Sequence, residues 1–400
     1  MVEQPDFKTR KCLLPKVNEI KNMNDIQMVD LGGQYKKIKT EVDARIQEVL
    51  NTSAFINGPE VKRFQGELEQ YLDVKHVIPC ANGTDALQVA MMALGLKPGD
   101  EVITTTFTFV ATAEVIALLG LTPVLVDCDP DSFLISTEAI EEAITSKTKA
   151  IIPVHLFGQC ANMEEIMKIA SKHKLKVIED AAQSIGASFH FADGRAKQSG
   201  TIGDFGCTSF FPSKNLGCYG DGGALFTNDD VLAEKARMVV NHGMKIRYYH
   251  DEIGVNSRLD SIQAAVLSVK LARLDDYCNA RRSAAFYYDE AFKDIPQVET
   301  PKRMRNSCHV FHQYTLKIKG VDRNALQAHM MENKAPAMIY YPVPLHQQKA
   351  YLDDRYQDGA FPIAEQLAIQ VMSLPMHTEL DQEQLEHITK TLIAFIEKNS

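Results

Sequence analysis

Short runs of β-branched and other apolar residues alternate with amphipathic stretches between residues 76 and 228. The strand-like runs are HVIPCA, EVITTT, TPVLVDCD, AIIPVHL, KVIEDAA, TSFF and GALFTN. Apolar residues at helical spacing separate several of these runs, over residues 85–94, 109–119, 137–144 and 163–173. Strands and helices repeated at this interval predict an α/β fold with a mostly parallel sheet covered on both faces. Such sheets bind ligands in the loops at the carboxyl ends of their strands.

The pattern becomes helical after residue 228. It predicts a helix over residues 229–242 and a long helix from 260 to about 292, whose apolar residues follow helical spacing. These apolar residues include Ile262, Val266, Val269 and Leu274. The long helix would join the sheet domain to whatever follows it.

Past Pro296 a strand-like run, QYTLKIKG, precedes a helical stretch at 322–333, the run AMIYYPVP and a closing helix near 382–397. This mixture is typical of a smaller α+β domain. We therefore expect an N-terminal extension over residues 1–27, a large domain over 28–275 and a small C-terminal domain over 276–400. The first residues of the large domain could pack on the small one.

Charge and composition exclude several classes of protein. The chain of 400 residues has 43 Lys and Arg against 52 Asp and Glu, which gives a net charge of -9 at pH 7. This sign is wrong for a protein held by its overall field on nucleic acid or anionic lipid, so any bound anion must be met by local groups. No run approaches the roughly 18 apolar residues that span a bilayer, and the charged first residues lack the apolar core of a secretory signal. We expect a cytoplasmic protein that binds neither nucleic acid nor membrane.

The eight cysteines are scattered, with no C-x-x-C pair and no histidines at zinc-site spacing. This distribution predicts reduced thiols, mostly buried, and no metal site. The cysteines are Cys12, Cys80, Cys128, Cys160, Cys207, Cys218, Cys278 and Cys308.

Two loops at strand ends carry polar groups suited to a ligand. Asn82-Gly83-Thr84 follows a strand and opens a helix, where N–H groups, a glycine and a hydroxyl can hold a phosphate. The same residues also suit an ordinary helix N-cap. Asp180 ends the strand KVIEDAA, where its carboxylate could pair with a protonated ring nitrogen or a metal, or merely cap the next helix.

A third loop, SFFPSKNLG, places Lys214 among hydroxyls, aromatic residues and glycines. A lysine removed from water has a lowered pKa and can attack a carbonyl as a neutral amine. A phosphate-binding lysine or a plain surface charge is equally compatible with the local sequence.

Five motifs together resemble one family. NGTDAL, TFTFVATA, VIEDAAQSIGA, CTSFFPSKNLGCYGDGGA and GVNSRLDSIQAA occur in the order and at the intervals of the DegT/StrS-type nucleotide-sugar aminotransferases. The resemblance extends from about Met28 to the C-terminus. It implies an enzyme that uses pyridoxal 5′-phosphate (PLP) and has the aspartate aminotransferase fold, known as PLP fold type I.

The resemblance assigns roles to the residues that match the family motifs. Lys214 would bind PLP covalently and, once freed, would carry a proton during catalysis. Asp180 would keep the pyridine nitrogen protonated, and Gln183 would hydrogen-bond the phenolic oxygen. The other cofactor contacts that it implies are Gly83, Thr84 and Ser209 at the phosphate, Phe109 on the ring face and Asn256 from a neighbouring subunit. Phe109 is nearly as compatible with a core aromatic residue.

Because Asn256 would reach the cofactor of a second copy, the resemblance implies a homodimer with shared active sites. Arg258 would arrive from the neighbouring subunit by the same route. Without the resemblance, both residues would be interpreted as a polar turn before the long helix.

Within the family, the motifs SFFPSK, GVNSRLD, YPVPLH and VMSLPMH most resemble enzymes that aminate C-3 of UDP-2-acetamido-2-deoxy-3-oxo-D-glucuronate. Those enzymes act in bacterial O-antigen and surface polysaccharide synthesis, and L-glutamate is the donor typical of the family. Arg258 would pair with the uronic carboxylate, because a guanidinium matches a carboxylate bidentately. Tyr341 and His346 are further candidates for substrate contacts. The sequence departs from the family pattern at Tyr340, where a histidine is expected.

Two other histidines, His309 and His312, lie in the same region as His346. One of the three could contact the sugar or its diphosphate, although a histidine in a packed strand or turn is more often structural. None is needed as a catalytic base while Lys214 is available.

Three alternatives remain at the level of sequence. A C-4 aminotransferase of a 4-keto-6-deoxy sugar nucleotide would share the cofactor residues. A PLP-dependent dehydratase of this fold would carry histidine in place of Lys214. A non-catalytic regulator that binds PLP or a sugar nucleotide would have no need of Lys214, Asp180 and Gln183 together.

Overall fold

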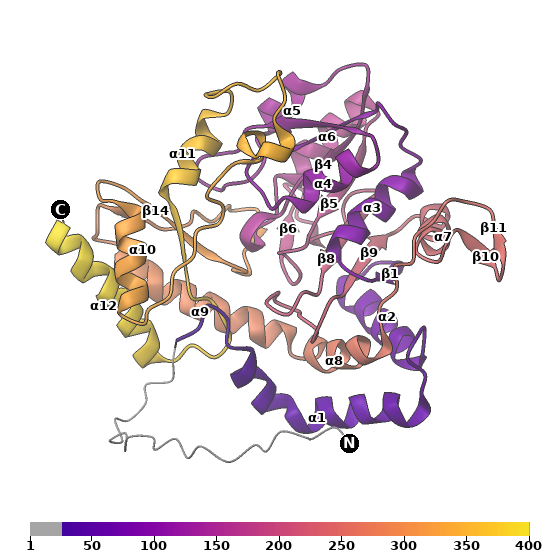
Figure 1. Cartoon of the computed structure of the whole chain (residues 1–400), viewed down its shortest axis with the longest axis horizontal. Coiled ribbons are helices and arrows are strands. Elements are labelled where there is room, and N and C mark those ends of the chain that lie inside the picture. Colours follow the sequence, from indigo (N-terminus) through magenta and orange to yellow (C-terminus); the bar gives the residue numbers. More distant parts are fainter. Residues whose placement is uncertain (1–25, 400) are drawn as a thin grey trace, which may run out of the picture.

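The computed structural model describes residues 26–399 (Figure 1). The extension predicted over residues 1–27 therefore falls almost wholly outside the described residues, as does Cys12. Within the described range, no helix combines the length and apolar character needed to cross a membrane.

A seven-stranded sheet forms the centre of the molecule, in the order β1-β9-β8-β5-β4-β2-β3. Strand β9 runs antiparallel to β1 and β8, and the other neighbouring strands are parallel, so the predicted mostly parallel sheet is confirmed. Every strand-like run between residues 76 and 228 lies in this sheet. Its strands are β1 (His76–Cys80), β2 (Glu101–Thr105), β3 (Thr122–Val126), β4 (Thr148–Ile152), β5 (Lys176–Asp180), β8 (Phe205–Ser209) and β9 (Gly223–Thr227).

Helices cover both faces of this sheet. Ile151 and Val177 belong to one hydrophobic cluster, and the next residues, Ile152 and Ile178, belong to another, because successive strand residues point to opposite faces. The first cluster includes residues of α2 (Pro59–Leu72), α5 (Thr137–Ala143), α6 (Met163–His173) and α8 (Ser261–Leu271). The second includes residues of α3 (Gly83–Leu94), α4 (Ala111–Leu118) and α7 (Asp230–Val239). Helix α1 (Leu31–Thr52) packs along α8.

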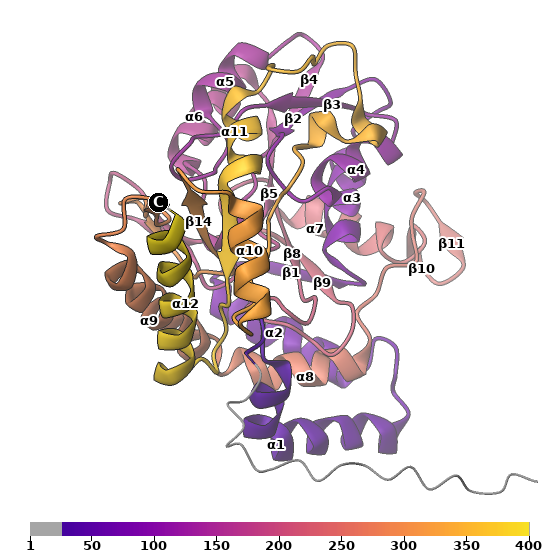
Figure 2. The same ribbon diagram turned by 60° about the vertical axis from the view of Figure 1, so that its left-hand side comes forward.

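A second group of elements follows α8 and surrounds its own hydrophobic cluster, on the opposite side of the molecule from α3 and α7 (Figures 1 and 2). Strand β14 lies between β12 and β15 in a three-stranded sheet. The elements of this group are α9 (Leu274–Phe292), β12 (Val298–Glu299), β14 (Tyr314–Ile318), α10 (Arg323–Glu332), β15 (Val371–Leu374) and α12 (Gln382–Asn399).

Smaller elements complete the described chain. Helix α11 (Pro362–Gln370) packs against residues beside the central sheet, where Leu367 shares a cluster with Phe107 and Leu125. The short strands are β6 (Ser188–His190), β7 (Ala196–Gln198), β10 (Met244–Ile246), β11 (Tyr249–His250) and β13 (Ser307–Cys308). The single-turn helices are η1 (Leu156–Gly158), η2 (Leu345–Gln347) and η3 (Lys349–Tyr351).

The single long helix predicted from 260 to 292 is wrong. The chain leaves the helical conformation at Arg273, whose φ is -118° and ψ is 5°, and this residue separates α8 from α9. The guanidinium of Arg273 donates a hydrogen bond to the carbonyl of Val269 (3.0 Å) and pairs with Glu41, so it satisfies a carbonyl at the end of α8. Neither proline nor glycine marks the break in the sequence, and the apolar spacing continues through it.

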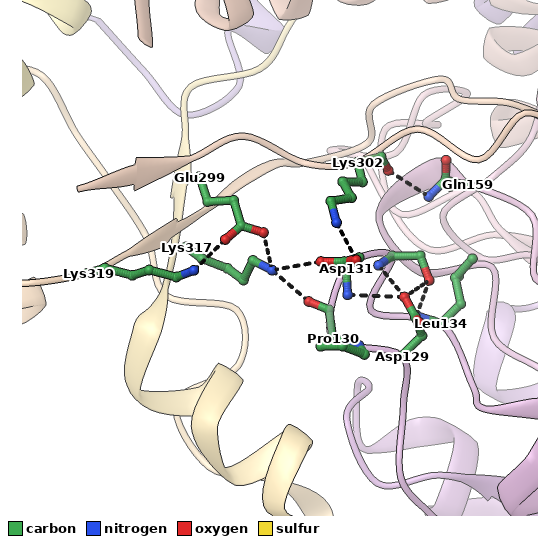
Figure 3. A network of polar contacts seen from close by, with 10 residues as sticks. Asp129, Pro130, Asp131, Leu134, Gln159, Glu299, Lys302, Lys317 and Lys319 are labelled. Atoms are coloured by element: carbon green, nitrogen blue, oxygen red, sulfur yellow. Dashed lines mark hydrogen bonds and ion pairs between the residues drawn. The ribbon is translucent and has the colours of Figure 1, made fainter. Parts of the chain in front are cut away.

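A polar network joins the second group of elements to the loop after β3 (Figure 3). Lys317, in β14, donates to the carbonyl of Pro130 (2.8 Å) and pairs with Asp131 (3.4 Å) and with Glu299. Lys302 also pairs with Asp131. These two lysines, Lys302 first, hold the pKa of Asp131 below its ordinary value because they stabilise the charged carboxylate.

We expect Asp131→Asn to lower the free energy of unfolding at pH 7 by at most about 1 kcal/mol, because water screens a carboxylate that is 39% exposed. The lowered pKa means that the stabilisation is present above about pH 4, the ordinary pKa of Asp, and is lost as the pH falls through the folded-state value. Urea unfolding of both proteins at pH 7 and near pH 3 measures the difference. A difference that does not shrink at low pH would contradict an ionic origin.

Candidate active site

A cavity of about 620 Å³ opens at the carboxyl ends of the central strands. Because parallel strands end at one edge of a sheet, the loops after β1, β2, β5 and β8 meet there. The second group of elements completes the wall with His312, Gln313, Tyr340 and Tyr341. The cavity gathers eight predicted site residues: Gly83, Thr84, Phe109, Asp180, Gln183, Ser209, Lys214 and Tyr341.

The loop that carries Lys214 is tightly closed. The N–H of Cys218 donates to the carbonyl of Phe210 at 2.8 Å, and this bond joins the two ends of the loop. Gly217 comes so close to the start of the loop that a Cβ there would lie 2.3 Å from the carbonyl oxygen of Pro212. A side chain at 217 would therefore force the loop apart and displace Lys214.

Two lysines have pKa values lowered to about 8 by burial, Lys214 and Lys270. The side chain of Lys270 already has partners within the protein: its ammonium donates a hydrogen bond to the carbonyl of Gly217 (2.7 Å) and lies 4.7 Å from the ring centre of Tyr219. Lys214 lines the cavity, and its amine makes no hydrogen bond to any residue from 26 to 399. Its main opposing influence is the negative charge of Asp180, which raises its pKa. The chain thus presents one uncommitted amine of lowered pKa to the cavity, within the part that the structure describes.

Asp180 lies at the end of β5, and only 6% of its surface is exposed. Burial raises the pKa of this carboxyl, and three groups oppose the shift: the Thr112 hydroxyl, the Ala182 N–H and the charge of Lys214. The hydroxyl of Thr112 donates to one carboxylate oxygen at 2.8 Å, and the N–H of Ala182 donates to the other at 3.2 Å. The carboxylate can therefore remain charged inside the protein.

The neighbouring carboxylate, Glu179, has a different role because strand alternation turns it to the other face of the sheet. It accepts backbone N–H groups from Gly200, Ile202 and Gly203 at 2.6 to 3.0 Å, and it contacts His155 at 2.9 Å. Through these hydrogen bonds, Glu179 holds the segment before β8 in place.

The amide of Gln183 has a defined orientation. Its oxygen accepts from the backbone N–H of Phe157 (2.7 Å), and its nitrogen donates to the hydroxyl of Tyr341 (3.1 Å). An amide nitrogen carries two hydrogens, so one N–H remains able to donate toward the cavity. Burial raises the pKa of Tyr341, which keeps its hydroxyl protonated.

The loop after β1 forms a helix start with free donors. The side chain of Asn82 caps α3 by accepting the N–H of Asp85 at 2.8 Å. Gly83 and Thr84 occupy the first turn, where backbone N–H groups have no carbonyl partner within the helix. Ser209 lies beside this turn, and a Cβ on Gly83 would stand 2.7 Å from its Cβ. The close approach places the Ser209 hydroxyl beside these N–H groups on the cavity wall, and this set of donors suits a phosphate.

Three predicted site residues lie outside this cavity. Asn256 is exposed and Arg258 is half-buried, after the β10–β11 hairpin that projects from the body of the molecule (Figure 1). Their roles in a neighbouring subunit stay predictions.

His346 is the third of these residues, and its contact with the substrate stays a prediction. Its ring is 1% exposed, with Nδ1 2.8 Å from the hydroxyl of Thr106 and Nε2 3.2 Å from the carboxylate of Glu365. Both nitrogens are used to tie the end of β2 to α11.

The structure places His312 at the cavity, one of three histidines that the sequence left between a substrate contact and a structural role. It lines the cavity, is 4% exposed, and its Nδ1 has no hydrogen-bond partner among residues 26–399. Burial first, and then the charge of Lys214, place its pKa well below the ordinary value for histidine. Arg281 fixes the backbone there by donating to the carbonyls of Phe311 (3.1 Å) and His312 (3.3 Å). Nothing in the run HVFHQY distinguishes His312 from His309, so no sequence signal pointed to it.

Tyr340 lines the cavity beside Tyr341, and Thr112 contacts Asp180 from behind. Neither was assigned a role from the sequence. Across residues 26–399, no cluster of three or more His, Cys, Asp or Glu side chains is arranged to hold a metal ion.

Comparison with known proteins identifies similar chains. Residues 36–393 match the model of the DegT/DnrJ/EryC1/StrS aminotransferase family. The chain is 48% identical to a protein of Geobacillus stearothermophilus named Pleiotropic regulatory protein, over 93% of this chain and 98% of that one. It is 47% identical to UDP-2-acetamido-2-deoxy-3-oxo-D-glucuronate aminotransferase of Pseudomonas aeruginosa, over 92% and 99% of the two chains.

A solved structure of NtdA from Bacillus subtilis, with bound cofactor PMP, is similar to this fold. Its TM-score is 0.86 at 31% sequence identity, and the match covers 95% of this chain and 87% of that one. PMP is the aminated form of PLP, the cofactor of the matched family.

The cavity fits PLP in the chemistry of its donors. The free N–H groups of Gly83 and Thr84 suit the phosphate, the buried carboxylate of Asp180 suits a protonated ring nitrogen, and the uncommitted amine of Lys214 suits the aldehyde.

The lowered pKa of Lys214 predicts how fast PLP attaches to apoprotein at each pH. Only the neutral amine attacks the aldehyde, so the attachment rate should rise with pH and level off above about pH 8. With an ordinary lysine, the rate would continue to rise until about pH 10.5. Stopped-flow absorbance measures this rate. Lys214→Arg should abolish attachment, and Lys270→Arg should keep the profile; a midpoint near 10 in the unmodified protein would contradict the assignment.

Gly83→Ala should weaken PLP binding by at least about 10-fold, because the added methyl group would lie 2.7 Å from the Cβ of Ser209 and force the α3 start and Ser209 apart. Absorbance titration of the apoprotein measures the dissociation constant. Gly66→Ala is the matched control: it lies within α2, and nothing is within 4 Å of the added Cβ. That variant should bind PLP normally and be up to about 1 kcal/mol more stable. Normal binding by Gly83→Ala would place the phosphate elsewhere.

Proposed function

The chain belongs to the DegT/DnrJ/EryC1/StrS aminotransferase family, and on that premise we propose that it aminates C-3 of a UDP-linked keto-sugar acid. The family resemblance inferred from the five motifs is thereby confirmed. The proposed acceptor is UDP-2-acetamido-2-deoxy-3-oxo-D-glucuronate, and the proposed donor is L-glutamate. The observation that carries the catalytic part of the proposal is the convergence of Lys214, Asp180 and Gln183 on one cavity.

PLP, when bound, supplies an electron-withdrawing ring that stabilises negative charge on the carbon that loses a proton. In the proposed site, Asp180 keeps the ring nitrogen protonated through its charged carboxylate. Gln183 donates its remaining N–H to the phenolic oxygen, and Phe109, which is 54% exposed at the cavity wall, covers one ring face.

Lys214 carries the proton transfers in this proposal. Once free of the cofactor, its neutral amine would remove the proton from the α-carbon of glutamate and become an ammonium. In the second half-reaction the protonated side chain would deliver a proton to C-3 of the sugar. A pKa of about 8 suits both tasks, because the group can accept and release a proton near neutral pH. The same residue therefore serves the donor and the acceptor in turn.

Recognition of the sugar nucleotide is assigned to local cations and polar groups, since the net charge of -9 opposes an anionic ligand. We propose that Arg258 of a neighbouring subunit pairs with the uronic carboxylate and that Asn256 of that subunit contacts the cofactor phosphate. Tyr341, already fixed by Gln183, would contact the sugar. This arrangement requires a homodimer. We place the enzyme in the cytoplasm, in synthesis of bacterial O-antigen or another surface polysaccharide.

Two other functions deserve a direct test. A C-4 aminotransferase of a 4-keto-6-deoxy sugar nucleotide would use the same cofactor residues. A regulator without catalysis corresponds to the name of the Geobacillus relative. The uncommitted amine of Lys214 next to the charge of Asp180 favours catalysis, because binding alone needs neither.

The deciding assay supplies purified, PLP-loaded protein with L-glutamate and each keto-sugar in turn, and follows 2-oxoglutarate and the amino-sugar. We expect turnover of the 3-oxo-uronate, and none in the Lys214→Arg variant. Turnover of the 4-keto sugar alone would overturn the choice of substrate. Binding of both sugar nucleotides without turnover of either would favour a regulator.

Arg258→Met should raise KM for the 3-oxo-uronate by about 10-fold to 100-fold, because a charge-assisted bidentate contact is lost. The control substrate is the same keto-sugar nucleotide with a hydroxymethyl group in place of the carboxylate, and Arg258→Met should change its KM little. For the 3-oxo-uronate, the KM of Arg258→Lys should lie between the values of the unmodified protein and of Arg258→Met, since lysine keeps the charge without the planar fork. Equal effects on both sugars would contradict a carboxylate contact.

A further inference from the structure

The first turn of α4 supplies a hydroxyl group to Asp180. Thr112 is 1% exposed, and its Oγ1 lies 2.8 Å from Oδ2 of Asp180. The other contact of this hydroxyl is the carbonyl of Phe109 at 3.4 Å, which is longer. A hydroxyl has one proton to donate, and the shorter contact to a charged acceptor is the stronger of the two.

The Asp180 carboxylate depends on few donors. The part of the chain that the structure describes gives its two oxygens one donor each, the Thr112 hydroxyl on Oδ2 and the Ala182 N–H on Oδ1. Because burial favours the neutral acid, loss of either donor shifts the group toward protonation. A protonated carboxyl would no longer present the charge that holds a proton on a ring nitrogen.

We propose that Thr112 is a positioning residue that holds the Asp180 carboxylate charged and turned toward the ring nitrogen of PLP. The inference rests on the proposed role of Asp180 in the functional assignment above. It gives the second half of the TFTFVATA motif a role: Phe109 and Thr112 act on the ring from one short segment, the first on its face and the second through Asp180. Thr112 does not line the cavity, so it would act on the cofactor through Asp180 and without direct contact.

The test measures dissociation constants of apoprotein for PLP and for its deaza analogue, in which a C–H group replaces the ring nitrogen. Thr112→Val keeps the side-chain shape and removes the hydroxyl, and Thr112→Ser restores the hydroxyl. We expect Thr112→Val to bind PLP about 10-fold to 100-fold more weakly, the range for a hydrogen bond to a charged group, and to bind the deaza analogue within about 2-fold of the unmodified protein. Thr112→Ser should restore PLP binding to within about 3-fold.

Asp180→Asn separates the failure of this inference from the failure of the assignment on which it rests. If Asp180 holds the ring nitrogen, Asp180→Asn loses affinity for PLP and not for the deaza analogue, and adding Thr112→Val to it costs little more. Equal loss of both ligands in Thr112→Val, or no loss of either, would overturn the role of Thr112. Failure of Asp180→Asn itself to distinguish the two ligands would overturn the role of Asp180. Thermal unfolding of each variant confirms that it is folded.

Discussion

The desolvation of Lys214 and Asp180 in a common cavity is the constraint on which the chemistry of this protein depends. Burial favours the neutral form of both groups: it lowers the pKa of the amine, to about 8 with the opposing charge of Asp180 included, and it raises the pKa of the carboxyl. For the amine this suits its proposed role, because only a neutral lysine can act as a nucleophile and a base. For the carboxyl it is harmful, and the fold opposes it with donors from Thr112 and Ala182 and with the nearby charge of Lys214. Burial thus favours the neutral form of each group, and the neighbouring groups favour its charged form.

The fold maintains this balance by assembling the cavity from two groups of elements. The central sheet brings the loops after its parallel strands to one edge, and the later part of the chain contributes His312 and Tyr341. Specific polar contacts join the two groups, in addition to the apolar cluster that Val371 of β15 shares with Phe107 and Leu125. They include the lysines on Asp131, the histidine bridge from Thr106 to Glu365 through His346, and the bond from Asn215 to the carbonyl of Val310. A change at these contacts would alter the cavity without touching a residue that lines it.

Sequence patterns predicted the central sheet well, because buried parallel strands are continuous apolar runs that turn residues interrupt. They predicted one helix where the chain forms two, because the break at Arg273 is made by a side chain reaching Val269 and Glu41 and has no local signature. Helices α1 and α2 were not predicted at all. Local spacing could not choose a role for Lys214 or Asp180, and the resemblance of five motifs supplied the choice.

Contacts between distant segments explain the remaining differences. His346 and His312 have similar local sequence, yet one ring is enclosed by Thr106 and Glu365, and the other lines the cavity with an unpartnered nitrogen among residues 26–399. Thr112 likewise acquires its place only when α4 packs beside the end of β5. None of these pairings is encoded in the spacing of neighbouring residues, and each depends on the finished tertiary structure.

We propose that Lys214 is the lysine that binds the cofactor, and Lys270, whose pKa is lowered to the same value, serves as an internal comparison. Borohydride reduction of the PLP-loaded protein fixes the cofactor on whichever lysine carries it, and peptide mass mapping then locates the added mass. We predict that the mass is found on the peptide that contains Lys214 and that addition of L-glutamate before borohydride prevents its incorporation. Mass on the Lys270 peptide, or incorporation that glutamate does not reduce, would contradict the account.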